Sequence, residues 1–194
     1  MALVKFNASE QFNFLQDILE NSEQILKEYK DNQDKLSINE TNQCLGWWVT
    51  IPYRFGLTED SKYLPTLSKS ISPIENITTV MISEVHSNLP QGIHAEDLPE
   101  GVRRFHVPIK FNQNARLNVL ENGSWVNYEW SPDSVFEFEN FYDPHYISCP
   151  EGDNRIVIMI DVFDGDMTDE KLFELKKWYD TWESLVGYHQ VDLT

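Results

Sequence analysis

The middle of the chain, between residues 77 and 163, contains a series of short segments with the composition of β-strands. They follow one another at intervals of roughly 8–15 residues and are separated by turn-forming residues. In "GVRRFHVPIKF" apolar and polar residues alternate, so Phe105, Val107 and Ile109 point to one face while Arg104 and His106 point to the other. Short strands at this spacing predict an antiparallel sandwich or barrel.

Helical patterns flank this β-rich region. Ser9 is a candidate cap for an amphipathic helix near the N-terminus, Thr168 for another near the C-terminus, and Pro65 opens a short helix between them. The sequence shows no internal repeat and no low-complexity linker. We therefore expect a single domain over residues 1–194, with a β core at about 75–165 and helical flanks at about 9–30 and 168–186.

Charge and composition exclude several classes of protein. The chain has 32 acidic and 15 basic residues and a net charge of -17, which argues against nucleic acid as a partner because phosphate binding needs clustered Lys and Arg. Its apolar stretches are shorter than the ~18 residues of a membrane span, and the first residues lack the apolar region of a signal peptide. Two cysteines do not make a disulfide scaffold. We expect a cytoplasmic protein of open oligomeric state.

The segment "GIHAED" contains a pair of candidate metal ligands. If the segment is extended, His94 and Glu96 point the same way, because successive strand residues alternate between faces. A third ligand is available in His145, which lies in a stretch rich in polar and turn-forming residues. Two histidines and one carboxylate form the facial triad of non-haem Fe(II) oxygenases. Asp97 is an alternative source of the carboxylate.

A second group of residues suggests an anion site. Arg155 opens the apolar run "RIVIMIDVF", where a buried guanidinium is costly unless an anion pairs with it. Asp161 lies on the same face of this strand and is one candidate partner. A bound dicarboxylate is the other, because the planar fork of arginine suits a carboxylate bidentately. The residues alone leave both partners open.

Taken together, these motifs resemble those of a known family. The pattern "H-x-E … R-F-H-V-P-I … H-(nine residues)-R-I-V-I-M-I-D" is similar to that of the aspartyl/asparaginyl β-hydroxylases, which are Fe(II)/2-oxoglutarate-dependent oxygenases and include relatives acting on free proline. The resemblance extends from about Pro65 to Phe163. It depends mainly on the R-x-H-x-P-[IL] segment and on the ten-residue step from His145 to Arg155.

The resemblance implies a fold and a set of site residues. The fold is mainly β, a double-stranded β-helix (a cupin-like jelly roll) with flanking N- and C-terminal helices. Six residues are then expected to build the site. The metal ligands are His94, Glu96 and His145, and the residues that bind 2-oxoglutarate or shape its pocket are Arg155, Arg104 and His106.

The resemblance also implies an activity. The protein would be a dioxygenase that uses Fe(II), 2-oxoglutarate and O₂ to hydroxylate an amino acid or a peptidyl side chain, while 2-oxoglutarate is decarboxylated to succinate. The substrate is left open between a small amino acid and a peptide or protein. Aromatic residues in "GWWVTIPYRF" and "SWVNYEW" either line the substrate pocket or belong to the core, and the core is favoured.

Two other functions compete with this hypothesis. One is a non-enzymatic jelly-roll module that binds a ligand or partner and retains the family residues. The other is a cupin-like enzyme that uses another metal without 2-oxoglutarate. The presence of His94, His145 and Arg155 argues against the first, and Arg155 with the Arg104-x-His106 pair argues against the second.

Overall fold

The strands form two antiparallel sheets in the computed structural model, which describes residues 3–7, 13–41, 46–89, 92–95, 98–131, 134–139, 144–186 and 188–190. The main sheet contains, in spatial order, β1 (Leu3–Asn7), β8 (Ser134–Glu139), β5 (Val102–Lys110), β10 (Arg155–Phe163), β4 (Ile77–Val85), β3 (Trp47–Arg54), β2 (Asn39–Thr41) and β11 (Tyr188–Gln190). The minor sheet contains β7 (Ser124–Glu129), β6 (Arg116–Glu121) and β9 (His145–Ser148).

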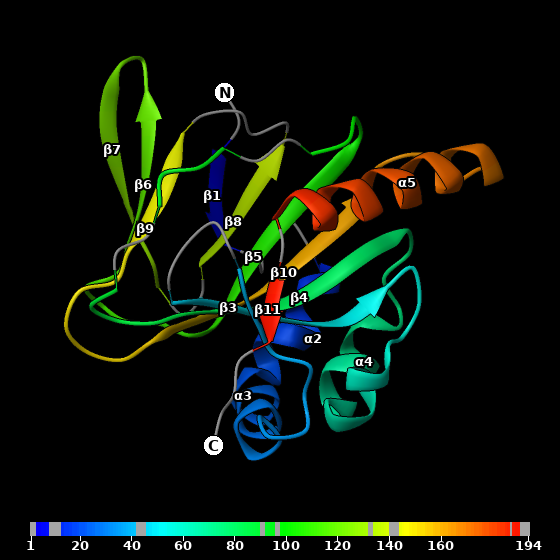
Figure 1. The fold of residues 1–194 in the computed structure, drawn as a ribbon, viewed down its shortest axis with the longest axis horizontal. Coiled ribbons are helices and arrows are strands. Elements are labelled where there is room, and N and C mark those ends of the chain that lie inside the picture. The colour runs from blue at the N-terminus through cyan, green and yellow to red at the C-terminus, as the bar shows by residue number, and fades with distance from the viewer. Residues whose placement is uncertain are drawn as a thin grey trace.

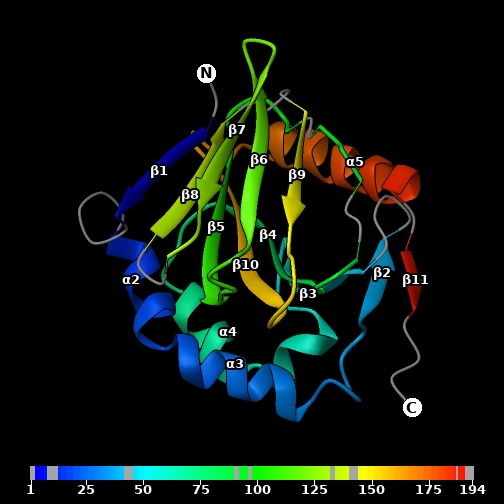
Figure 2. The same ribbon diagram turned by 90° about the vertical axis from the view of Figure 1, so that its left-hand side faces the viewer.

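Three of the described helices cover the face of the main sheet that points away from the minor sheet. The described helices are α2 (Asn13–Glu20), α3 (Ser22–Asp31), α4 (Pro65–Ile71) and α5 (Asp169–Val186), with a 3-10 helix at Glu59–Tyr63. The first three pack on one face of the main sheet, and the minor sheet lies across the opposite face (Figures 1 and 2). The arrangement is the double-stranded β-helix with flanking helices that the sequence predicted. Among the described residues, no helix is long and apolar enough to span a bilayer.

Two apolar clusters explain the patterns of the central strands. Phe105 and Val107 of β5 belong to the cluster under the helices, whereas Met81 of β4 and Met159 of β10 belong to the cluster between the two sheets. Because β10 is covered on both faces, its sequence is almost continuously apolar rather than alternating. The alternation in β5 is confirmed, and it directs Arg104 and His106 into the space between the sheets.

Local signals account for several element boundaries. The hairpin between β6 and β7 turns at Asn122 and Gly123, which have φ values of 49° and 80°, as a two-residue type I′ turn requires. The hydroxyl of Thr168 accepts a hydrogen bond from the backbone N–H of Lys171 at 3.2 Å and so caps α5 as expected. The β10 register against β5 shifts opposite Pro108, which has no N–H to donate.

Other expectations need correction. The N-terminal helical pattern forms two helices, because the side-chain amide of Asn21 donates to the carbonyl of Asp17 at 2.7 Å and ends α2. The proposed cap, Ser9, lies outside the described residues. The stretch beginning at His145 is a strand, β9, and the short strands β1, β2 and β11 were not predicted.

Candidate active site

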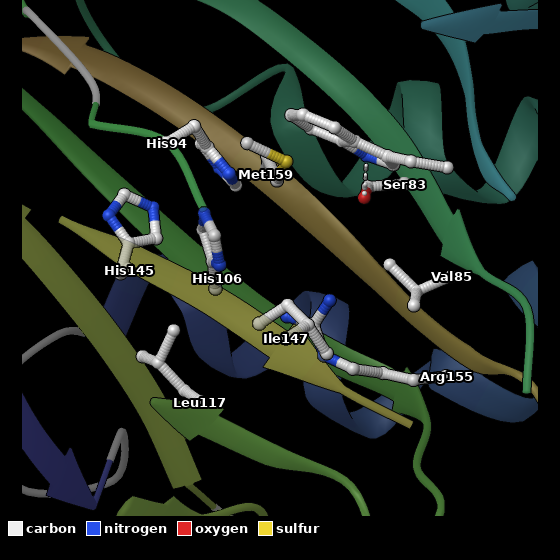
Figure 3. A pocket seen from close by; sticks show the side chains of 10 residues that line it. Ser83, Val85, His94, His106, Leu117, His145, Ile147, Arg155 and Met159 are labelled. Atoms are coloured by element: carbon white, nitrogen blue, oxygen red, sulfur yellow. Dashed lines mark hydrogen bonds between the residues drawn. The ribbon is translucent and has the colours of Figure 1, made fainter. Parts of the chain in front are cut away.

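A pocket lies between the two sheets. Its polar lining residues are Ser83, His94, His106, His145 and Arg155. They come from both sheets: Ser83, His106 and Arg155 from the main sheet, and His145 from the minor sheet. Figure 3 shows the three imidazoles grouped at one end of the pocket, with the side chain of Arg155 extending toward them from β10. Apolar side chains, including those of Met159 and Ile147, form the remaining walls.

The structure brings together the two histidines predicted to bind a metal. His94 and His145 form an isolated antiparallel bridge, in which the His94 N–H donates to the His145 carbonyl at 3.0 Å and the His145 N–H donates back at 2.7 Å. Their ring centroids lie 4.4 Å apart. His94 Nδ1 lies 3.0 Å from the Gly92 carbonyl, which requires the proton on Nδ1 and leaves Nε2 as a lone-pair donor.

The third predicted ligand falls outside the described part of the chain. Both Glu96 and its alternative, Asp97, lie in the gap between residues 95 and 98. Within the residues that are described, no group of three or more His, Cys, Asp and Glu side chains could hold a metal ion. The described part of the predicted triad is therefore the His94–His145 pair, and the assignment of a carboxylate ligand stays a prediction.

His106 is a third imidazole in the pocket. It lies in the middle of β5, opposite Met159 of β10, and is buried. Burial lowers the pKa of His106 well below its usual value, and the positive charges of Arg155 and Arg104 lower it further. A neutral imidazole can accept or donate a hydrogen bond toward a ligand without adding a charge to the site.

Arg155 is a buried cation with unused donors. Its side chain is 2% exposed, and its Nε and Nη2 atoms have no hydrogen-bond partner among the described residues. Its Cζ atom lies 3.9 Å from the centroid of the Trp130 ring. Burial lowers the pKa of Arg155 from 12.5 to about 9. An anion placed at this edge would compensate the buried charge.

Arg104 has an internal partner. Its Nε and Nη2 donate to the two carboxylate oxygens of Asp161 at 2.6 and 2.7 Å, and both side chains are buried. The hydroxyl of Tyr179 on α5 also donates to Asp161, at 2.8 Å. Arg104 is not one of the described residues that line the pocket. Arg104 therefore shares a face of β5 with His106, as expected, but only His106 lines the pocket.

The pairing of Arg104 decides whether Asp161 is the partner of Arg155, which the sequence left open. Asp161 forms its ion pair with Arg104, because the antiparallel register places those two residues opposite each other on β5 and β10. Arg155 lies six residues from Asp161 on the same strand, so their Cα atoms are roughly 20 Å apart at about 3.3 Å per residue. Strand geometry alone would have excluded Asp161 as the partner of Arg155.

Sequence reasoning missed several residues around the pocket. Trp47 lines it and donates from Nε1 to the Ser83 hydroxyl at 2.8 Å, and its ring stacks 5.4 Å from that of His94. Ser83 shares a face of β4 with Met81, a signal that was present in the alternation of the strand. Trp130 contacts Arg155 from the end of β7, and no sequence pattern pointed to that contact.

No protein-family model matches the sequence, and no curated protein matches it either. Solved structures do resemble the fold. A prolyl-4-hydroxylase from Pseudomonas putida has a TM-score of 0.54 and 12% identity, covering 84% of this chain and 93% of the other. A prolyl hydroxylase from Trichoplax adhaerens, in complex with a peptide fragment of the hypoxia inducible factor oxygen degradation domain, has a TM-score of 0.53 and 14% identity, covering 89% and 86%.

A third structure is similar to the same extent. The dioxygenase for auxin oxidation 1 from Arabidopsis thaliana, in a binary complex with 2-oxoglutarate, has a TM-score of 0.52 and 10% identity, covering 86% of this chain and 85% of the other. At these identities the similarity establishes the fold and not the activity. The chain therefore shares the double-stranded β-helix fold of these two prolyl hydroxylases and this dioxygenase.

Proposed function

We propose that the protein is an Fe(II)/2-oxoglutarate-dependent dioxygenase that hydroxylates an amino acid or a peptidyl side chain. Fe(II) would be held by His94 and His145 together with Glu96, and the distal carboxylate of 2-oxoglutarate would pair with Arg155. The bound iron would supply O₂ activation, with 2-oxoglutarate decarboxylated to succinate. The Trichoplax structure with its bound peptide fragment supports including peptides among the candidate substrates.

One internal comparison carries this proposal. Arg104 binds the carboxylate of Asp161 through Nε and Nη2, and the same two atoms of Arg155 have no partner among the described residues. A buried guanidinium edge of this kind matches a carboxylate that comes from outside the chain. The pocket also contains two imidazoles whose backbones are bonded to each other, which fits a metal centre beside the anion site.

The other residues would support this chemistry. His106, neutral in its buried position, would contact the cosubstrate between the metal end and Arg155. Arg104 would help shape the pocket through Asp161 rather than by contact with the cosubstrate. The apolar walls would exclude water from the reacting groups, which strengthens charge interactions inside the pocket.

Spectroscopy and product analysis test the proposal directly. Anaerobic addition of Fe(II) and 2-oxoglutarate should produce a metal-to-ligand charge-transfer band, and addition of O₂ with ascorbate should produce succinate. Arg155→Gln should weaken 2-oxoglutarate binding by about 2–4 kcal/mol, because a charge-assisted pair is lost. Arg103→Gln is the matched control, since Arg103 lies near the start of β5, as Arg155 lies at the start of β10, but pairs with Glu137 and Asp164.

Two results would reject the proposal. Folded wild-type protein that gives neither the band nor succinate would favour a non-enzymatic module. A band that forms equally well in the wild type and in the Arg155→Gln variant would show that the anion binds elsewhere.

A further inference from the structure

Trp130 lies against the anion site without lining the pocket. It follows the end of β7 and is 5% exposed. Its ring meets that of Phe136 edge-on at a centroid distance of 4.4 Å and lies nearly parallel to that of His106 at 6.3 Å. Its Nε1 is buried and has no hydrogen-bond partner among the described residues. Trp130 is thus fixed by its neighbours in the space between the two sheets.

The contact between Trp130 and Arg155 is tight. The guanidinium carbon lies 3.9 Å from the ring centroid, whereas the corresponding distance from Arg104 to Trp182 is 6.0 Å. A guanidinium carbon this close to a ring centroid lies over the aromatic face, which is where a guanidinium interacts favourably with tryptophan. Desolvated cation–π contacts of this type contribute about 2 kcal/mol.

The close contact with the Trp130 face limits the orientations open to the Arg155 guanidinium. The N–H groups of a guanidinium lie in its plane, so a stacked fork directs them along the ring face rather than into it. Nε and Nη2, which have no partner among the described residues, form the edge that would receive a carboxylate. The same edge of Arg104 is oriented by Asp161, whereas for Arg155 the described neighbour that can orient it is Trp130.

We propose that Trp130 is a positioning residue for the cosubstrate, which holds the Arg155 guanidinium so that its Nε–Nη2 edge faces the distal carboxylate. This inference rests on the proposed function. It also assigns Trp130 a part in specificity, because a fixed fork favours 2-oxo acids with a second carboxylate over those without one. 2-Oxoglutarate should therefore bind better than 2-oxobutyrate, and the preference should decrease when Trp130 is replaced.

A double-mutant cycle tests this role without requiring turnover. The dissociation constant of 2-oxoglutarate is measured by calorimetry on protein without added metal, for the wild type, Trp130→Leu, Arg155→Gln and the double variant. Trp130→Leu should weaken binding about tenfold, and Trp130→Phe, which keeps an aromatic face, about threefold. In the Arg155→Gln background, Trp130→Leu should cause no further loss of affinity for 2-oxoglutarate, because Trp130 acts only by orienting the side chain of Arg155.

The controls separate positioning from packing. Trp125→Leu removes a tryptophan of β7, the strand just before Trp130, that is 42% exposed, and it should leave the dissociation constant unchanged. Thermal melting of each variant reports folding. If Trp130→Leu does not fold, Trp130→Phe replaces it in the same cycle.

Each outcome is decisive. Equal losses of affinity in the two Arg155 backgrounds, or wild-type affinity in Trp130→Leu, would overturn the inference while leaving the proposed function intact. If the cycle shows the expected coupling but no succinate forms with iron present, the anion site stands and the proposed activity fails. If the wild type binds no 2-oxoglutarate either without metal or with Fe(II) added, both fail.

Discussion

Two buried arginines, Arg104 and Arg155, occupy the space between the sheets under opposite conditions. Arg104 has a bidentate carboxylate partner, whereas Nε and Nη2 of Arg155 have no described acceptor and its guanidinium lies over the ring of Trp130. Breaking a buried ion pair leaves an uncompensated charge, whereas removing an unpaired buried cation relieves a desolvation cost. The two residues should therefore respond differently to the same substitution.

We expect Arg104→Met to lower the free energy of unfolding by about 3–5 kcal/mol, because Asp161 is left buried without its cation. Arg155→Met should change it by no more than about 1 kcal/mol in either direction, since the lost stacking offsets the relieved desolvation. Urea denaturation at neutral pH measures both. A large loss of stability in Arg155→Met would mean that this arginine is a structural residue.

At this scale the sequence predicted some contacts and missed others. The pairing of His94 with His145 followed from the chemistry of metal ligands and from the spacing of a known motif, and the structure places the two imidazoles together. The contact of Trp130 with Arg155 depends on how the minor sheet packs on the main sheet. No local pattern specifies that packing, so composition alone favoured a core role for the tryptophan.

Helix α5 is the element whose attachment is most specific. It runs along the same side of the main sheet as the minor sheet (Figure 1). Trp182 of this helix packs on the cluster between the sheets. The Tyr179 hydroxyl donates to Asp161 at 2.8 Å and lies 2.8 Å from the Thr78 hydroxyl. Burial raises the pKa of Tyr179 well above its usual value, so the phenol stays protonated. The helix is thereby bonded to the acid that holds Arg104.

Tyr179→Phe should lower the free energy of unfolding by about 1–3 kcal/mol, because buried polar groups on Asp161 and Thr78 lose a partner. The 2-oxoglutarate dissociation constant should not change, since Asp161 keeps Arg104. Chemical denaturation and calorimetry give the two values. Tyr128→Phe is the control, because the Tyr128 hydroxyl bonds to the partly exposed Glu121 on the hairpin. A weaker cosubstrate affinity in Tyr179→Phe would extend the site to α5.

Elements were predictable where the pattern was long. The strands β4, β5 and β10 each have nine residues, and their apolar or alternating composition identified them. The strands β2, β9 and β11 have only three or four residues and were missed, because so short a segment cannot show a recognisable alternation of apolar and polar residues. They form through pairing with distant segments, as β9 does with β6.

Across the whole molecule, Glu84 joins the helical layer to the sheet. It lies on the helix-facing side of β4, where it accepts hydrogen bonds from Tyr29 at 2.9 Å, Lys30 at 2.9 Å and Asn154 at 2.8 Å. Burial alone would raise the pKa of Glu84, but the hydrogen bonds from Lys30 and Asn154 and the charge of Lys30 lower it below its usual 4.5. The ionised form is therefore the one that stabilises the fold.

Because the folded-state pKa of Glu84 lies below the unfolded value, its contribution to stability is complete above about pH 4.5 and is lost as the pH falls through the folded-state pKa. Glu84→Gln should lower stability at neutral pH and flatten this part of the profile. Unfolding free energies measured between pH 3 and pH 7 show the difference. Glu23→Gln, on the exposed face of α3, should leave the profile as it is, and identical profiles for both variants would contradict this role.

The enclosed cation of Arg155 has a kinetic consequence in a protein with a net charge of -17. A dianion diffusing toward that guanidinium meets a repulsive long-range field before any attraction from the interior is felt. Added electrolyte screens the outer field more than the contact at the bottom of the pocket. Entry of the dianion should therefore speed up with ionic strength, the reverse of the usual behaviour of oppositely charged partners.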